Sequence, residues 1–275
     1  MGGTVSAENG RTLSEAMLTD AIHRAENGVP AILGFLSPGE RRIAERYLRS
    51  QGVTRALFWG GYPTAERTLL LLPPEYLEES VPRLGENDED FFPDEMLHPV
   101  LEDALAAIRI RGSGYRTLTH RDYLGSLLAL GIERDVLGDI AVQNEREAVV
   151  FCTERMVTYL LTALEKVAND SVRCERYVPD EHFTDGRRYA PMSDTVASMR
   201  LDCIVASLAN LSREAAQRAI HSGMVEVNYE VCERVDRILE APTTLSVRGV
   251  GKFILRSTDG ETRKGRIRIR SDKLI

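Results

Sequence analysis

The sequence has no apolar run long enough to cross a membrane. A transmembrane helix needs about 20 consecutive, mostly apolar residues, and polar or charged residues interrupt every stretch of that length here. Residues 1–8 have neither the basic start nor the apolar core of a secretory signal. These absences argue against a membrane partner and predict a cytoplasmic protein.

Cysteines and histidines are few and scattered. The four cysteines stand singly, with no C-x-x-C pair, and none of the five histidines lies near a cysteine or a second histidine at ligand spacing. A structural metal site needs clustered ligands of these types. Cys152 and Cys203 lie in apolar segments, as small core residues do. We therefore expect neither a metal nor a cofactor.

Motifs for catalysis are incomplete. His120-Arg121-Asp122 resembles the catalytic triplet of protein kinases, but it lacks the following asparagine and a glycine-rich phosphate loop. Gly112-Ser113-Gly114 lacks the third glycine of a dinucleotide-binding loop and the downstream acid that binds the ribose. The sequence thus predicts a protein that is not an enzyme, and His120 and Arg121 stay candidates for contact with RNA or a protein partner.

The charge is distributed unevenly along the chain. The formal net charge is −7 over 275 residues. Residues 176–275 contain 17 Lys and Arg against 14 Asp and Glu, a net +3, whereas residues 1–175 contain 18 against 28, a net −10. Residues 248–273 alone carry +6. A basic end on an acidic body is expected of a nucleic-acid-binding module, although a solvated basic tail has the same composition.

Residues 1–84 are predicted to form a small α+β domain. Helices are expected over 12–27 and from Ser37, which begins a capping box with Glu40. Two β-rich runs, 56–59 and 68–72, flank a glycine-led loop that ends in Arg67, a candidate phosphate contact. The acidic segment 82–93 contains prolines and a glycine, which interrupt helices and strands, and it is predicted to be a linker.

Residues 93–178 are predicted to form a second domain in the order β-α-β-β-α-β. The predicted strands are 105–111, 138–142, 148–152 and 171–177, and the helices are 119–130 and 153–168. This order is that of the ferredoxin-like fold. A common RNA-recognition module has the same topology and stacks bases on sheet aromatics. These strands lack paired aromatics, so we favour a scaffolding role.

Residues 192–275 are predicted to form a third domain, after a polar linker over 181–191. One helix is expected over 194–211 and a second from Ser212, with Gly223 left-handed at its end. Strand 224–229 follows, and residues 266–270 alternate isoleucine with arginine, which predicts a strand with one cationic face. The whole chain is therefore predicted to be α+β.

Residues of this third domain resemble a known RNA-binding module. Arg200-Leu201-Asp202, Ser212-Arg213, Gly223 and Val227-Asn228 match, in order and spacing, the alpha-L motif of small-subunit ribosomal protein S-four. Tyr229 departs from that motif, which usually has glycine there, and 241–243 replaces its usual Gly-Asp turn. Upstream, the segments 58–67 and 118–125 are similar to those of the YlmH family of bacterial proteins.

The resemblance implies a non-catalytic factor that binds rRNA and tRNA on an obstructed large ribosomal subunit, in ribosome-associated quality control. Carried over to this chain, it implies an RNA face made by eight residues. Arg200 and Arg213 are expected to hold phosphates, Gln217, His221 and Asn228 to make hydrogen bonds, and Leu201 and Asp202 to set the helix geometry. The eight are Arg200, Leu201, Asp202, Ser212, Arg213, Gln217, His221 and Asn228.

Two other functions stay open from the sequence. Motifs of this kind are often appended to RNA-modifying enzymes, so an accessory role in such an enzyme is one alternative. The YlmH family has also been linked to cell division, and the acidic N-terminal domains would then dock a protein partner. Retention of ribosomal subunits, turnover of an RNA base, or capture of proteins without RNA would separate these functions.

Overall fold

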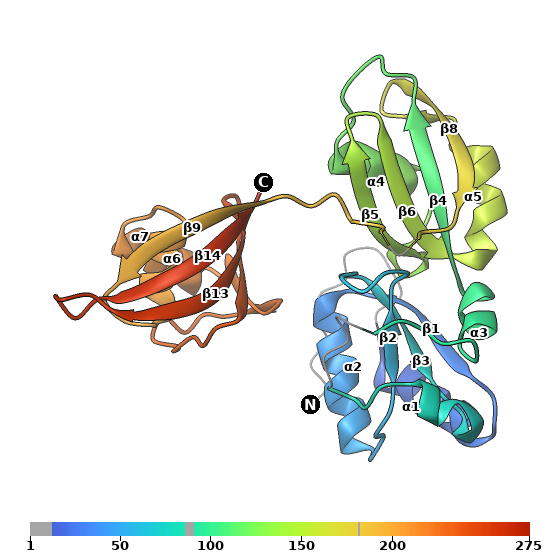
Figure 1. The fold of residues 1–275 in the computed structure, drawn as a ribbon, viewed down its shortest axis with the longest axis horizontal. Helices are drawn as coiled ribbons and strands as arrows, with labels where there is room; N and C mark the ends of the chain where they lie inside the picture. Colours follow the sequence, from blue (N-terminus) through green and yellow to red (C-terminus); the bar gives the residue numbers. More distant parts are fainter. Residues whose placement is uncertain (1–12, 86–90, 181) are drawn as a thin grey trace. The chain divides into compact units, whose positions relative to one another are not determined.

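The structure is a computed structural model that describes residues 13–85, 91–180 and 182–275. The chain divides into two compact units, Met1–Gly186 and Arg187–Ile275 (Figure 1). The start of the predicted first helix and parts of both predicted linkers lie outside the described residues. A finer division of the first unit into two domains stays a prediction.

The first part of the first unit is a three-stranded antiparallel sheet in the order β1-β3-β2 (Figure 1). Ser37 begins α2 with the predicted capping box, in which Ser37 and Glu40 satisfy each other's backbone N–H groups. The prediction missed β1, a short apolar run whose partner, β3, lies far along the chain. The elements are α1 (Glu15–Glu26), β1 (Ala31–Leu36), α2 (Pro38–Ser50), β2 (Leu57–Trp59), β3 (Thr68–Leu72) and the 3-10 helix η1 (Glu75–Ser80).

The second part of the first unit is a five-stranded antiparallel sheet in the order β5-β6-β4-β8-β7. Helices α4 and α5 pack on one face, where Tyr123, Leu127 and Leu160 are fully buried. The elements are α3 (His98–Glu102), β4 (Leu105–Gly112), α4 (His120–Ala129), η3 (Arg134–Val136), β5 (Leu137–Asn144), β6 (Glu147–Thr153), η4 (Glu154–Met156), α5 (Val157–Ala163), β7 (Lys166–Val167) and β8 (Asp170–Tyr177).

The four predicted strands of this part are present within one or two residues of their predicted ends. Helix α5 is shorter than predicted, because Lys166–Val167 turns back to pair with Asp170 and Ser171. Ala168, in the left-handed region at φ 51°, makes that turn. The name ferredoxin-like for this arrangement stays a prediction.

The second unit is a six-stranded antiparallel sheet in the order β11-β10-β12-β13-β14-β9. Helices α6 and α7 cover one face, and Leu201, Ile204, Ala216 and Ile220 are buried against it. The elements are β9 (Tyr189–Val196), α6 (Leu201–Leu208), α7 (Arg213–His221), β10 (Val225–Val227), β11 (Glu230–Val231), β12 (Thr243–Val247), β13 (Gly251–Glu261) and β14 (Ile267–Leu274).

The predicted helix over 194–211 is wrong in its first third. Residues Tyr189–Val196 form the edge strand β9 instead, and α6 begins only at Leu201. All eight residues of β9 are in register with β14, and alternate residues exchange backbone hydrogen bonds with it, whereas the backbone groups between them face away from the sheet. Pro191 is tolerated because β9 is an edge strand.

The predicted α+β class is confirmed, with three antiparallel sheets. Within the described ranges, no helix has the length and apolar character that a membrane span requires.

Candidate nucleic-acid interface

The carboxylate of Asp202 is the centre of a polar network between α6 and α7. Asp202 lies in the first turn of α6 and is fully buried. It accepts hydrogen bonds from Arg200 Nε at 3.0 Å, from Arg213 Nε at 3.1 Å and from Gln217 Nε2 at 2.9 Å. One buried acid therefore holds side chains from the start of both helices.

The electrostatics of this network favour the charged acid. Burial alone would raise the pKa of Asp202, but the hydrogen bonds from Arg200, Gln217 and Arg213 outweigh it and hold that pKa well below its usual range. A negative charge in the first turn also complements the helix dipole of α6. The carboxylate therefore stays ionised and keeps both arginines in place.

The two arginines keep part of their surface in solvent. The side chain of Arg200 is 34% exposed and that of Arg213 is 58% exposed. The described hydrogen bond of Arg213 uses Nε, so its Nη nitrogens are available to a second acceptor. A guanidinium held on one side by a buried acid is preorganised to bind a phosphate with two donors on the other side.

The start of α6 itself is closed to an anion. The backbone N–H groups of Leu201 and Asp202 donate to the carbonyls of Arg237 and Val235 at 2.8 and 3.1 Å. These two N–H groups are therefore already paired. Any anion here would be bound by the arginine side chains.

The other predicted residues divide into structural and exposed ones. Leu201 is fully buried in the core, and the Ser212 hydroxyl caps α7 by accepting the Ala215 N–H at 3.1 Å. His221 is exposed in the last turn of α7, and it does not join Arg213 and Gln217 in the Asp202 network. Gly223 has the predicted left-handed φ, at 69°.

Asn228 shapes the turn between β10 and β11. Its Oδ1 accepts the Thr244 N–H at 2.9 Å, and its own N–H donates to the Thr244 carbonyl at 2.7 Å. Asn228 and Tyr229 both have positive φ, 51° and 66°, as the two central residues of a tight hairpin turn require. The Lys252 ammonium lies 4.7 Å from the Tyr229 ring centroid, a contact that glycine at position 229 would lack.

The predicted cationic strand is β14. Ile269 is buried, whereas Arg266, Arg268 and Arg270 are exposed. Two of these arginines have partners, since Arg270 pairs with Asp259 and Arg266 donates to Thr195. Arg268 has no ion pair within the described parts of the chain. Strand β14 lies between β13 and β9, so a truncation that removed it would disrupt the sheet and expose the core. A point substitution is therefore the suitable test of the cationic face of β14.

Arg67, in the first unit, is not a phosphate contact. Its guanidinium donates to the carbonyls of Leu137, Arg134 and Phe35 at 2.8, 2.7 and 3.1 Å. Burial lowers the pKa of Arg67. The expectation from the sequence was wrong because all three acceptors are backbone carbonyls. Every residue type has such a carbonyl, so the sequence does not show which of them bind a side chain.

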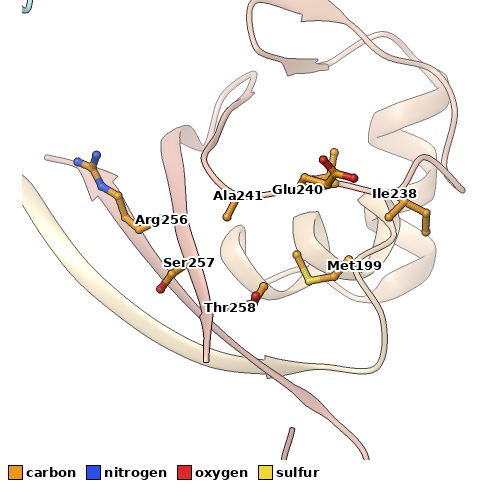
Figure 2. A pocket seen from close by; sticks show the side chains of 8 residues that line it. Met199, Ile238, Glu240, Ala241, Arg256, Ser257 and Thr258 are labelled. Carbon is orange, nitrogen blue, oxygen red and sulfur yellow. The ribbon is translucent and has the colours of Figure 1, made fainter. Parts of the chain in front are cut away.

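A pocket of about 590 Å³ opens in the second unit beside the start of α6. Its walls are mostly apolar, with Met199, Ile238 and Ala241, and the charged groups Glu240 and Arg256 lie at different walls (Figure 2). Within 13–85, 91–180 and 182–275, no three His, Cys, Asp or Glu side chains gather as metal ligands do.

Three comparisons relate this chain to known proteins. Residues 104–181 match the family model described as "Putative RNA-binding domain in YlmH". The chain is 28% identical over 236 residues to Ribosome-associated protein quality control protein P2 of Bacillus subtilis (strain 168), covering 86% of this chain and 84% of that protein. The structure of cell division protein ylmH from Streptococcus pneumoniae aligns with 59% of this chain and 87% of its own, at 19% identity and a TM-score of 0.44. The predicted resemblance to YlmH proteins is thus confirmed for residues 104–181, and over most of its length the chain is similar to a ribosome-associated quality control protein.

Proposed function

We propose that this protein binds rRNA and tRNA on the large ribosomal subunit as a factor of ribosome-associated quality control, without performing chemistry. The observation that carries the proposal is the Asp202 network, which holds Arg200 and Arg213 at the starts of two adjacent helices. The match of residues 104–181 and the similarity to a quality control protein support it. In this proposal the second unit is an alpha-L domain.

The direct experiment is sedimentation of the tagged, full-length protein with separated small and large ribosomal subunits. Co-sedimentation with the large subunit, and its loss as salt is raised, is the expected result, because phosphate contacts release counterions on binding. Capture of protein partners without RNA would contradict the proposal and favour an adaptor. Turnover of an RNA base by the pure protein would instead identify an enzyme.

Arg213→Ala is expected to weaken RNA binding and to reduce the slope of log affinity against log salt by about one. The reason is that Arg213 is fixed by Asp202 yet is 58% exposed. The measurement is a salt titration of binding to large subunits. Arg218→Ala is the matched control, since Arg218 lies on the same helix, is 67% exposed and pairs with Glu214 at 2.8 Å. An unchanged slope for Arg213→Ala would refute its assignment.

Arg268→Ala is expected to weaken binding to all RNAs alike, again with a salt slope reduced by about one. Arg268 is exposed on β14 beside Arg266 and Arg270, so its loss leaves the core intact, and stability should change by no more than about 0.5 kcal/mol. Affinities for two unrelated RNAs, with Arg234→Ala as the control, measure this. A changed preference between the two RNAs would show that Arg268 reads sequence or shape instead.

A further inference from the structure

The loop between β4 and α4 carries the most exposed large apolar side chain of the described residues. Tyr115 is 82% exposed. A single exposed aromatic is common on protein surfaces and needs no function. Tyr115 differs because the backbone that carries it is held by hydrogen bonds and because an arginine packs against the residue before it.

The buried carboxylate of Asp170 holds this loop in place through hydrogen bonds. Asp170, at the start of β8, is 1% exposed, and its carboxylate accepts the Ser113 hydroxyl and, at 3.4 Å, the Gly114 N–H. The N–H groups of Gly112 and Leu118 donate to the carbonyls of Arg146 and Glu145 at 2.7 and 2.9 Å. Both ends of the loop are therefore tied to the β5–β6 turn, and Tyr115 needs little ordering to serve as a binding platform.

An arginine lies against the loop next to this tyrosine. Gly114 has φ +89°, and a Cβ there would stand 3.0 to 3.1 Å from the Nε, Cζ and Nη1 atoms of Arg146. The Arg146 guanidinium is thus packed on the Gly114 backbone, one residue from Tyr115. Glycine suits this position because its φ is positive and because a side chain would push against the guanidinium.

Two carboxylates near the loop are already bound, which leaves the exposed arginines in excess over the exposed acid Glu145. Asp122 is held by the Thr119 capping box, and Glu147 pairs with both Arg109 and Arg111. The exposed arginines near the loop are Arg116, Arg121, Arg146 and Arg173. Among the described residues, only Arg116 of these four has an ion pair, with Asp122 at 3.4 Å.

The sheet of the same domain does not offer such a platform. Phe151 of β6 is fully buried, with its ring centroid 5.0 Å from that of Tyr62 and 5.5 Å from that of Phe183. Tyr177 of β8 packs on Phe183 as well. Stacking of a base on these sheet aromatics is therefore blocked, in keeping with the scaffolding role expected of the sheet.

We propose that Tyr115 and Arg146 form a stacking site for an unpaired nucleotide of RNA, in which the ring stacks on the base and the guanidinium contacts its phosphate. This inference rests on the proposed function as an RNA-binding protein and adds a second contact, in the first unit. The cations favour RNA over a protein partner, and residues 104–181 match an RNA-binding domain.

The test compares two RNAs with the full-length protein: a blunt duplex and the same stem closed by an unpaired uridine loop. Tyr115→Ala is expected to weaken binding to the looped RNA about 5- to 150-fold, the range for loss of one base–aromatic stack, and to leave duplex binding unchanged. Tyr115→Phe should retain the wild-type affinity. Tyr76→Ala, which removes another tyrosine of the first unit, 62% exposed, is the matched control.

A direct readout comes from Tyr115→Trp. The chain has one natural tryptophan, Trp59, which is 9% exposed and gives a constant background. Looped RNA should quench the emission of the new tryptophan, and duplex RNA should not. Equal affinity of Tyr115→Ala and wild type for the looped RNA, or no quenching, overturns the stacking site.

Failure of this inference is distinguishable from failure of the proposed function. If Arg213→Ala weakens binding and Tyr115→Ala does not, only the stacking site is wrong. If wild type binds neither RNA nor large subunits, both proposals fall. If Tyr115→Ala loses binding to large subunits but not to looped RNA, Tyr115 contacts a ribosomal protein, which also overturns the stacking site.

Discussion

Asp202→Ala is expected to destabilise the second unit by about 3 kcal/mol and to abolish its RNA binding. Breaking a buried ion pair costs about 3–5 kcal/mol when the remaining charge stays buried. The lower end applies here because Arg200 and Arg213 are 34% and 58% exposed and can turn to water. Gln217, in contrast, loses its acceptor between the helices.

Calorimetry and amide hydrogen exchange of α6 and α7 are the suitable measurements, since the single tryptophan lies in the first unit. Asp236→Ala is the control, because Asp236 is 58% exposed and its pair with Arg234 spans 3.6 Å; surface pairs of this kind contribute about 0–1 kcal/mol. Equal effects of the two substitutions would contradict a central role for Asp202.

The effect of Asp202→Ala should also depend on pH. The folded protein holds the pKa of Asp202 below its value in the unfolded chain, about 3.9. Stability from this group is therefore fully present above about pH 4–5 and is lost as the pH falls toward the folded pKa. The gap in stability between wild type and Asp202→Ala should narrow in acid and stay constant near neutrality.

The sequence predicted those parts of the fold that depend on interactions between residues close together in the chain. Ser37 and Thr119 each form a capping box with an acid three residues later, and both helices begin there. Gly223 ends α7 for an equally local reason, its positive φ. Strand β9 was missed because its partner, β14, follows about 70 to 85 residues later, and no local pattern records that pairing.

The sequence could indicate which residues belong to the candidate site, but not how they are arranged in space. Spacing places Arg213 and Gln217 on one face of a helix, and both do reach the same group. That group, Asp202, belongs to the other helix, so their convergence depends on how α6 and α7 pack. His221 has the same helical spacing but lies one turn further along α7, outside the Asp202 network.

Gly61→Ala is expected to destabilise the first unit by about 3 kcal/mol or more. Gly61 has φ +99°, and a Cβ there would stand 2.4 Å from the Cδ1 and Cε1 atoms of Phe151, whose ring is fully buried. The left-handed backbone costs an alanine about 1–2 kcal/mol. Displacing a packed core ring costs about 1–3 kcal/mol more.

Gly52→Ala is the matched control for this substitution. Gly52 also has positive φ, +78°, but no atom lies within 4 Å of the position that an added methyl group would take, so only the backbone cost of about 1 kcal/mol applies. Urea unfolding followed by the emission of Trp59, two residues from Gly61 in sequence, measures both variants. Equal urea midpoints for Gly61→Ala and Gly52→Ala would show that the Phe151 ring can move aside without lowering the free energy of unfolding.

The reason for so large an effect lies in what the segment after Gly61 connects. Asp139, on β5, accepts the Tyr62 hydroxyl at 2.6 Å and the Glu66 and Arg67 N–H groups at 2.8 and 3.1 Å. These bonds join the three-stranded sheet to the five-stranded one. Because Gly61 is where that segment touches Phe151, its substitution should loosen both sheets together, and the loss of Trp59 emission should coincide with increased hydrogen exchange in β5 and β6.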